Sequence, residues 1–175
     1  MIFARCRSLG RLAAVTALLL AAGAAGAQVA FDVNGVKLGD REDAVKKVFP
    51  GIRCKPLEWR SDAADRRCDD ARIAFASVEA RVTFYLKADA VQGFDVRFDN
   101  AHLDPVTDYL KRRWGKPFSE GRETISRKNQ DPRESYKVLW EHGKDRVLLS
   151  SLSTGKRVSL SGSRGNFEEE IYRVK

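Results

Sequence analysis

Strict alternation between apolar and polar side chains runs through the middle of this chain. Every second residue is apolar in residues 80–86, and the pattern returns in residues 94–98 after a polar break at Asp89. Side chains of a β-strand point alternately to its two faces, so this pattern requires strands with one buried and one exposed face. Such strands, following one another closely, predict an antiparallel meander.

Two amphipathic helices are predicted, one before and one after these strands. The first begins at Asp40, its expected N-cap, and ends at Pro50-Gly51. Its apolar stripe consists of Ala44, Val45, Val48 and Phe49. The second begins at Asp104, again as N-cap, and ends at Gly115 before Pro117.

Further strands are expected after the second helix, at residues 123–127, 136–140, 147–152 and 157–160. This order of elements predicts an α+β domain, an antiparallel sheet with helices packed on one face. It also suggests two tandem αβββ units, residues 31–99 and 100–175, a repeat that rests on pattern alone. The tail, residues 166–175, fits a helix and a strand equally well. Trp114 and Trp140 follow the apolar periods and are expected in the core.

Residues 1–27 have the order of a bacterial Sec-type signal peptide. Arginines without an acidic partner come first, an apolar run from Leu12 to Ala22 follows, and Ala25-Gly26-Ala27 offers small residues to a signal peptidase. The run is shorter than the roughly 20 apolar residues that span a bilayer, and no cysteine follows it to carry a lipid. We expect cleavage before Gln28, one domain over residues 28–175, and a periplasmic or secreted location without a stable membrane anchor.

Cys54 and Cys68 are the only cysteines outside the predicted signal peptide, and they are expected to form a disulfide. The disulfide would staple the polar stretch between Gly51 and Arg72, which shows no sustained period and is expected to be a long loop. A metal site would need more cysteines or histidines at short spacing. His102 and His142 are isolated, so no metal ligand set is expected.

Motifs that could carry catalysis are weak. Ser153-Thr154-Gly155-Lys156 matches S-x-x-K, but it falls in a predicted hairpin turn and not on a helix. Ser161-Gly162-Ser163-Arg164-Gly165 lacks the spacing of a nucleophile elbow and is expected to be a flexible loop. His102 and His142 fit surface or capping positions better than that of a base. We therefore expect no catalytic residue and no cofactor.

Features that could bind a partner are better defined. Trp59 lies among charged residues in the predicted disulfide loop, either as a contact residue or as a lid over the core. The outward strand face mixes aromatic, cationic and apolar side chains, and it is either a partner surface or an ordinary solvated face. Its candidate residues are Arg81, Tyr85, Arg97, Lys137 and Leu139. The net charge of +8 comes from scattered basic residues, so nucleic-acid binding is not expected.

Two short stretches resemble known envelope proteins. Gly35-Val36-Lys37-Leu38-Gly39-Asp40, with Val45 and Phe49-Pro50-Gly51, resembles a G-x-x-x-G-(S/D) entry to an amphipathic helix, and Tyr109-Leu110 through Trp114-Gly115-Lys116-Pro117 resembles a V-x-x-x-(F/Y)-G-x-P ending. Both are similar to the SmpA/OmlA outer-membrane assembly lipoproteins and to the β-lactamase-inhibitor-protein-like fold of tandem αβββ units. The resemblance implies a non-catalytic envelope protein that binds another protein through a sheet face. The chain departs from SmpA/OmlA in lacking the lipobox cysteine.

The sequence therefore predicts an exported, non-catalytic protein-interaction module of the inhibitor or assembly-factor type, with a protein partner in the cell envelope. The alternative is a small periplasmic hydrolase or ligand-binding enzyme whose site is assembled from residues distant in sequence. A pocket that joins a histidine, a carboxylate and a hydroxyl would favour the enzyme. A shallow, exposed sheet face would favour the binder. The sequence leaves the oligomeric state open.

Overall fold

The computed structural model describes residues 30–126 and 131–173 of the chain. The predicted signal peptide, residues 1–27, and its cleavage site lie outside the described residues. None of the helices in the described part is long and apolar enough to cross a membrane.

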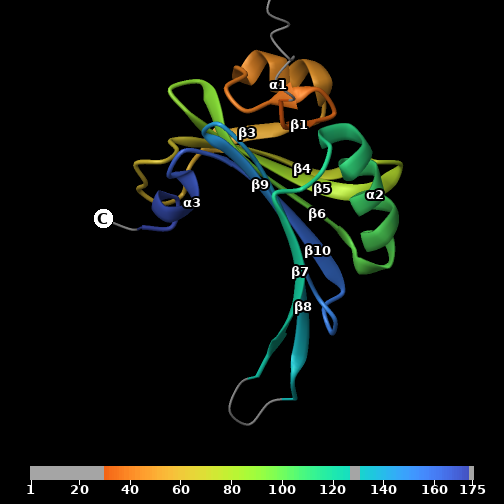
Figure 1. The fold of residues 1–175 in the computed structure, drawn as a ribbon. Coiled ribbons are helices and arrows are strands. Elements are labelled where there is room, and N and C mark those ends of the chain that lie inside the picture. Colours follow the sequence, from red (N-terminus) through yellow and green to blue (C-terminus); the bar gives the residue numbers. More distant parts are fainter. Residues whose placement is uncertain (1–29, 127–130, 174–175) are drawn as a thin grey trace, which may run out of the picture.

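Eight antiparallel strands form one curved sheet in the order β3-β4-β5-β6-β10-β9-β8-β7 (Figure 1). Its strands are β3 (Arg53–Pro56), β4 (Arg66–Phe75), β5 (Val78–Lys87), β6 (Ala90–Asp99), β7 (Ser119–Ile125), β8 (Arg133–His142), β9 (Asp145–Leu152) and β10 (Arg157–Arg164). A two-stranded ribbon precedes the sheet, β1 (Asp32–Val33) and β2 (Val36–Lys37), and it turns at Asn34-Gly35, where φ is positive at both residues. The predicted α+β class and antiparallel sheet are confirmed.

Each of two helices is followed by a meander of four strands, one more than the predicted αβββ unit contains. Helix α1 (Glu42–Val48) precedes β3 to β6, and α2 (Leu103–Trp114), entered through the short turn η1 (Asn100–His102), precedes β7 to β10. The last strands of the two meanders, β6 and β10, pair with each other at the centre of the sheet. We call this β6–β10 ladder the central seam.

Two strands at the edges of the sheet differ from the expectation. The prediction of a structureless loop between Gly51 and Arg72 is wrong, because β3 and the first part of β4 lie in it. Cys54 is partly buried and the other three residues of β3 are exposed, so this strand shows no apolar alternation. Strand β7 begins at Ser119 and ends at Ile125, whereas residues 123–127 were expected, because all its residues are exposed and leave no period to read.

The predicted flexible loop at Ser161–Gly165 is also wrong. Most of this segment is the second half of β10, where Gly162 and Ser163 are buried between β6 and β9. A Cβ on Gly162 would stand 2.2 Å from the Phe94 ring, so the ring occupies the space that a side chain would need. Small residues that look like a loop in the sequence therefore make room for an aromatic ring in the sheet.

The larger core cluster joins residues of the sheet with residues of α1 and α2. The alternation in β5 and β6 is confirmed, since the predicted apolar residues within 80–86 and 94–98 are buried, and Phe84 has no exposed surface. The Phe84 ring lies 5.6 Å from Phe49, which follows α1, and the Trp140 ring lies 5.6 Å from Trp114 of α2. Both tryptophans are in the core, as predicted.

The helix ends differ from the predicted ones. The N-caps are Arg41 for α1 and His102 for α2, and neither side chain caps its helix. Asp40 instead accepts a hydrogen bond from the Lys37 N–H at 2.8 Å, so its carboxylate is already used in the preceding turn. Val48, expected in the apolar stripe, is 39% exposed because the short helix α1 buries only Val45.

A second, smaller cluster covers part of the other face of the sheet. The tail folds into a short helix, α3 (Phe167–Glu170), which Figure 1 shows on the side of the sheet opposite α2. Phe167 and Ile171 pack there against Tyr85 and against Ala63-Ala64 from the loop between β3 and β4.

Candidate binding surface

The sheet face that points away from the larger core carries the residues that alternate with the buried ones. We call it the outer face. In its middle it consists of Arg81 and Thr83 on β5, Asp95 and Arg97 on β6, Ser159 and Ser161 on β10, Leu148 and Ser150 on β9, and Lys137 and Leu139 on β8. All of these side chains are at least partly exposed.

The strand register places three predicted contact residues in one row across the outer face. Arg81 is directly opposite Arg97, Arg97 is opposite Ser159, Ser159 is opposite Ser150, and Ser150 is opposite Lys137. With neighbouring strands about 4.8 Å apart, the row is roughly 19 Å long. Cations therefore stand at both ends of the row, with two small hydroxyl residues between them.

The predicted residue Leu139 belongs to the next row. It lies opposite Leu148 on β9, and Leu148 lies opposite Ser161 on β10. Both leucines are partly exposed, and they form a small apolar patch beside the serines. The structure therefore brings Arg81, Arg97, Lys137 and Leu139 onto one continuous surface.

The cations of the row differ in how firmly they are held. Arg97 donates hydrogen bonds to Asp95 at 2.6 and 2.9 Å, which raises the pKa of the Arg97 guanidinium and keeps it charged. Lys137 pairs with Glu123 at 3.0 Å. Arg81 is exposed and forms no ion pair within the described residues. Arg81 is therefore the cation of the row most available to an anionic group of a partner.

Tyr85 lies on the predicted face but is not exposed. Its side chain is only 9% accessible because α3 covers it, and its ring centre lies 5.4 Å from that of Phe167. Burial raises the pKa of the Tyr85 hydroxyl above its usual value, so the group stays neutral. The prediction that Tyr85 is an exposed contact residue is wrong, although its strand register is correct.

Trp59 is half-buried and belongs to the same small cluster. Its indole Nε1–H donates to the Ile171 carbonyl at 2.7 Å, and its ring stacks on Tyr172 at 6.1 Å. The indole therefore ties the loop between β3 and β4 to the C-terminal segment. It covers the second cluster and not the larger core.

Arg97→Ala and Tyr85→Ala are expected to affect stability differently. Loss of the exposed Arg97 side chain should change the free energy of unfolding by about 0.5 kcal/mol or less. Loss of the Tyr85 ring should cost roughly 2 kcal/mol, because it removes apolar surface that Phe167 covers. Urea denaturation of both variants measures the difference. Equal effects would show that α3 does not protect Tyr85 in solution.

Two adjoining hollows on the outer face share Tyr85 and Asp95. The larger, about 430 Å³, is lined by three arginines, Arg67, Arg81 and Arg97, and three aspartates, Asp69, Asp70 and Asp95. Its charges balance, and Arg67 pairs with Asp69 at 2.8 Å. The smaller, about 230 Å³, lies beside α3. No histidine lines either hollow.

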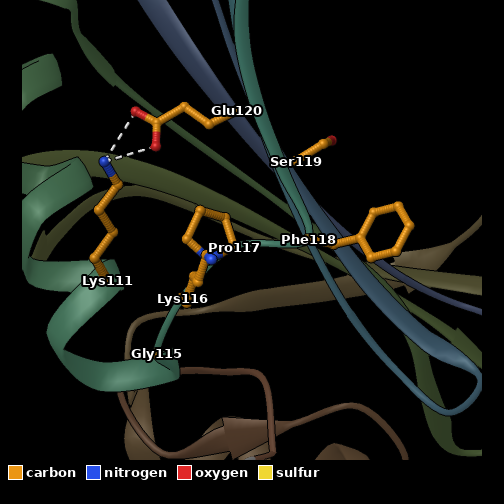
Figure 2. Close-up of a pocket in the computed structure, with 7 residues that line it drawn as sticks. All are labelled: Lys111, Gly115, Lys116, Pro117, Phe118, Ser119 and Glu120. Carbon is orange, nitrogen blue, oxygen red and sulfur yellow. Dashed lines mark hydrogen bonds and ion pairs between the residues drawn. The ribbon is translucent and has the colours of Figure 1, made fainter.

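A further hollow of about 440 Å³ lies where α2 ends and β7 begins (Figure 2). Lys111 of α2 and Glu120 of β7 form an ion pair at 2.8 Å along its side. Phe118 is 72% exposed, and Figure 2 shows its ring pointing away from this pair. Ser119 is its only hydroxyl residue, and the hollow holds no histidine, so it does not assemble a catalytic group.

Another hollow, of about 480 Å³, joins His142 to Asp145 and Arg164, but none of the residues that line it carries a hydroxyl. His102 and His142 are both exposed, and in the described part neither shares a side-chain hydrogen bond with a hydroxyl or carboxylate. Ser153 to Lys156 lie in the turn between β9 and β10, as predicted. Glu42, Cys54 and Cys68 lie together, but the two sulfurs are bonded to each other as the predicted disulfide and are not free thiolates.

Sequence reasoning missed the second cluster that covers one end of the outer face. Its signal in the sequence is the pair Phe167 and Ile171, four residues apart as on one side of a helix. A second signal is Gly93, where a Cβ would stand 2.3 Å from the Phe167 ring.

Comparison of the chain with protein-family models, with curated proteins and with solved structures found no significant match.

Proposed function

We propose that this protein is an exported, non-catalytic protein-interaction module of the cell envelope, of the inhibitor or assembly-factor type. We propose that it binds its partner through the outer face. The observation that carries the proposal is the row from Arg81 to Lys137, which crosses the middle of the sheet with cations at its ends and remains uncovered. A partly exposed pair of leucines, Leu139 and Leu148, lies beside it.

The composition of this surface supports binding to a protein. Interfaces commonly combine a small apolar centre with arginines, which give directed hydrogen bonds at low cost in flexibility. Here Arg97 is already held by Asp95, so little further ordering is needed when a partner carboxylate approaches. The small serines between the cations allow a partner backbone to come close to the sheet.

The location in the envelope rests on two features. The Cys54–Cys68 disulfide is typical of an oxidising compartment, outside the cytoplasm. The order of residues 1–27 is that of a signal peptide. The proposal also includes the resemblance of two short stretches to the SmpA/OmlA lipoproteins and to the β-lactamase-inhibitor-protein-like fold. It includes the interpretation of each helix and its meander as one copy of a repeated unit, with α1 and α2 on one face.

A photo-reactive residue in place of Ser150 tests the proposal, because Ser150 lies in the middle of the row. Irradiation in intact envelope should give one discrete adduct with a protein. The same residue at Val48 serves as the matched control, since Val48 is exposed on α1, away from the outer face. An adduct of equal yield at Val48, or none at Ser150, would contradict a partner on the outer face.

Charge reversal makes the test specific to the row. The variant Arg81→Glu/Lys137→Glu should reduce the Ser150 adduct roughly tenfold or more, because both ends of the row would repel a carboxylate. The control is Lys47→Glu/Arg112→Glu, the same double charge change at exposed positions of α1 and α2, away from the outer face. It should leave the adduct unchanged. A similar loss in both variants would indicate a general charge effect and no binding at the row.

A further inference from the structure

The two edges of the sheet differ in how well they are protected against pairing with another strand. The edge strand β3 has four residues, ends at Pro56 and carries the cations Arg53 and Lys55. Short length, proline and charge are the usual features that block edge-to-edge association. The other edge strand, β7, has seven residues and contains no proline, and its charges are of both signs, so a second strand can match them. It is therefore the open edge of this sheet.

Strand β7 has a free hydrogen-bonding side. It pairs with β8 along its whole length, from Ser119↔Leu139 to Ile125↔Arg133. No strand in the described ranges pairs with its other side, and all seven residues are exposed. In an antiparallel pair, the backbone groups of alternate residues point away from the neighbour. These outward N–H and C=O groups are complementary to another extended strand.

The charges on β7 have an arrangement that is complementary to itself. Glu120 and Arg122 lie on the same strand face, since both contact Tyr136 of β8. The Tyr136 hydroxyl donates to Glu120, and the Arg122 guanidinium lies 5.0 Å from the Tyr136 ring centre. One acid and one base are thus held on either side of Gly121.

We propose that two copies of this chain pair antiparallel along β7, with a two-fold axis beside Gly121. In this register Glu120 of each copy lies directly opposite Arg122 of the other copy, which gives two reciprocal attractive pairs. Ser119 then lies opposite Glu123, and Phe118 lies opposite Thr124. The pairing joins the two sheets into one continuous sheet across the axis.

The two registers on either side of this one are unfavourable. A two-fold antiparallel pair must place one residue opposite itself. With Arg122 at the axis, two arginines face each other, and with Glu120 at the axis, two glutamates face each other. Like charges directly opposite each other destabilise a strand pair. Gly121 also suits the central position, because a Cβ there would have no neighbour within 4 Å, so its side of the strand is open.

A cysteine at the axis gives the most direct test. In the proposed dimer, Gly121→Cys places two cysteines opposite each other at a Cα separation of roughly 4.5 to 5.5 Å, which a disulfide can span. The open space at this position means that the substitution should not disturb the fold. Mild oxidation of the purified protein should convert most chains to a disulfide-linked dimer. Ser119→Cys is the control, since Ser119 would face Glu123 and not its own copy.

The charge pairs give a second, independent test by sedimentation equilibrium. The unmodified protein should dimerise reversibly as its concentration rises. Arg122→Glu or Glu120→Arg alone should weaken the dimer about tenfold or more, because each turns two attractive pairs into two repulsive ones. The combined variant Glu120→Arg/Arg122→Glu should restore it. Arg72→Glu, the same charge change on another exposed hairpin, should have no effect.

Three results would overturn the proposal. The first is a protein that stays monomeric at all concentrations while Gly121→Cys fails to cross-link. The second is a dimer that ignores both single charge changes, which would place the contact elsewhere. The third is a folded double variant, checked by circular dichroism, that does not regain the dimer, which would show that Glu120 and Arg122 do not face each other across the axis.

Discussion

Replacing Phe84 by alanine is expected to lower the free energy of unfolding by about 3 to 5 kcal/mol, through lost burial and the cavity left behind. Phe84 has no exposed surface, and its ring lies 5.6 Å from Phe49 and 6.5 Å from Phe94. Neither neighbour can close the space without moving a strand or α1. Urea denaturation should show a lower midpoint with an unchanged slope.

The matched control lies on the same strand. Lys87 is exposed at the end of β5, and Lys87→Ala should shift the free energy of unfolding by about 0.5 kcal/mol or less. Comparable losses in the two variants would mean that the alternation of β5 does not separate a buried from an exposed side in solution.

Reducing the Cys54–Cys68 disulfide is expected to cost about 3 kcal/mol, the amount that the chain-entropy model gives for a closed loop of about 15 residues. The cysteines are 14 positions apart and directly opposite each other on β3 and β4. The bond therefore joins two strands, whereas a long loop is what the sequence predicts between Gly51 and Arg72. Reduction should loosen the edge strand β3 and leave the remaining seven strands folded.

Thiol titration and denaturation measure this effect together. The denatured, unreduced protein should contain no free thiol in its residues 28–175. Reductant should lower its stability, and it should have no effect on a Cys54→Ser/Cys68→Ser variant, which separates the bond from side effects of the reductant. Two titratable thiols in protein recovered from the envelope would contradict both the bond and the proposed oxidising location.

The parts of the fold that could be predicted are the strands and helices with one buried face and one solvent-exposed face. In β5 and β6, apolar and charged residues alternate, and both the strands and their buried sides follow from that pattern. Trp114 and Trp140 were placed in the core by the same argument. The edge strand β3 could not be found in this way, and the bounds of β7 could not be placed, because almost nothing in either strand is buried.

The outer face was predicted in part for a related reason. Alternation fixes the side of a strand on which Arg81, Arg97, Lys137 and Leu139 stand, and the register then groups them. It says nothing about which segments cover that side, so the burial of Tyr85 under α3 could not be foreseen. Contacts between residues far apart in the chain, such as Trp59 with Ile171, leave no local period in the sequence.

Much of the entropy cost of closing loops during folding falls on the central seam. Within the described part of the large sheet, every other ladder joins strands that follow one another in the chain, so a turn or a single loop brings them together. The seam instead pairs Asp99 with Arg157 and Gly93 with Ser163, across a long intervening segment. Closing so long a loop costs more entropy than closing a hairpin turn, and distant pairings slow folding. We therefore expect the two meanders to form first and separately, and the pairing of β6 with β10 to limit the rate at which the sheet is completed.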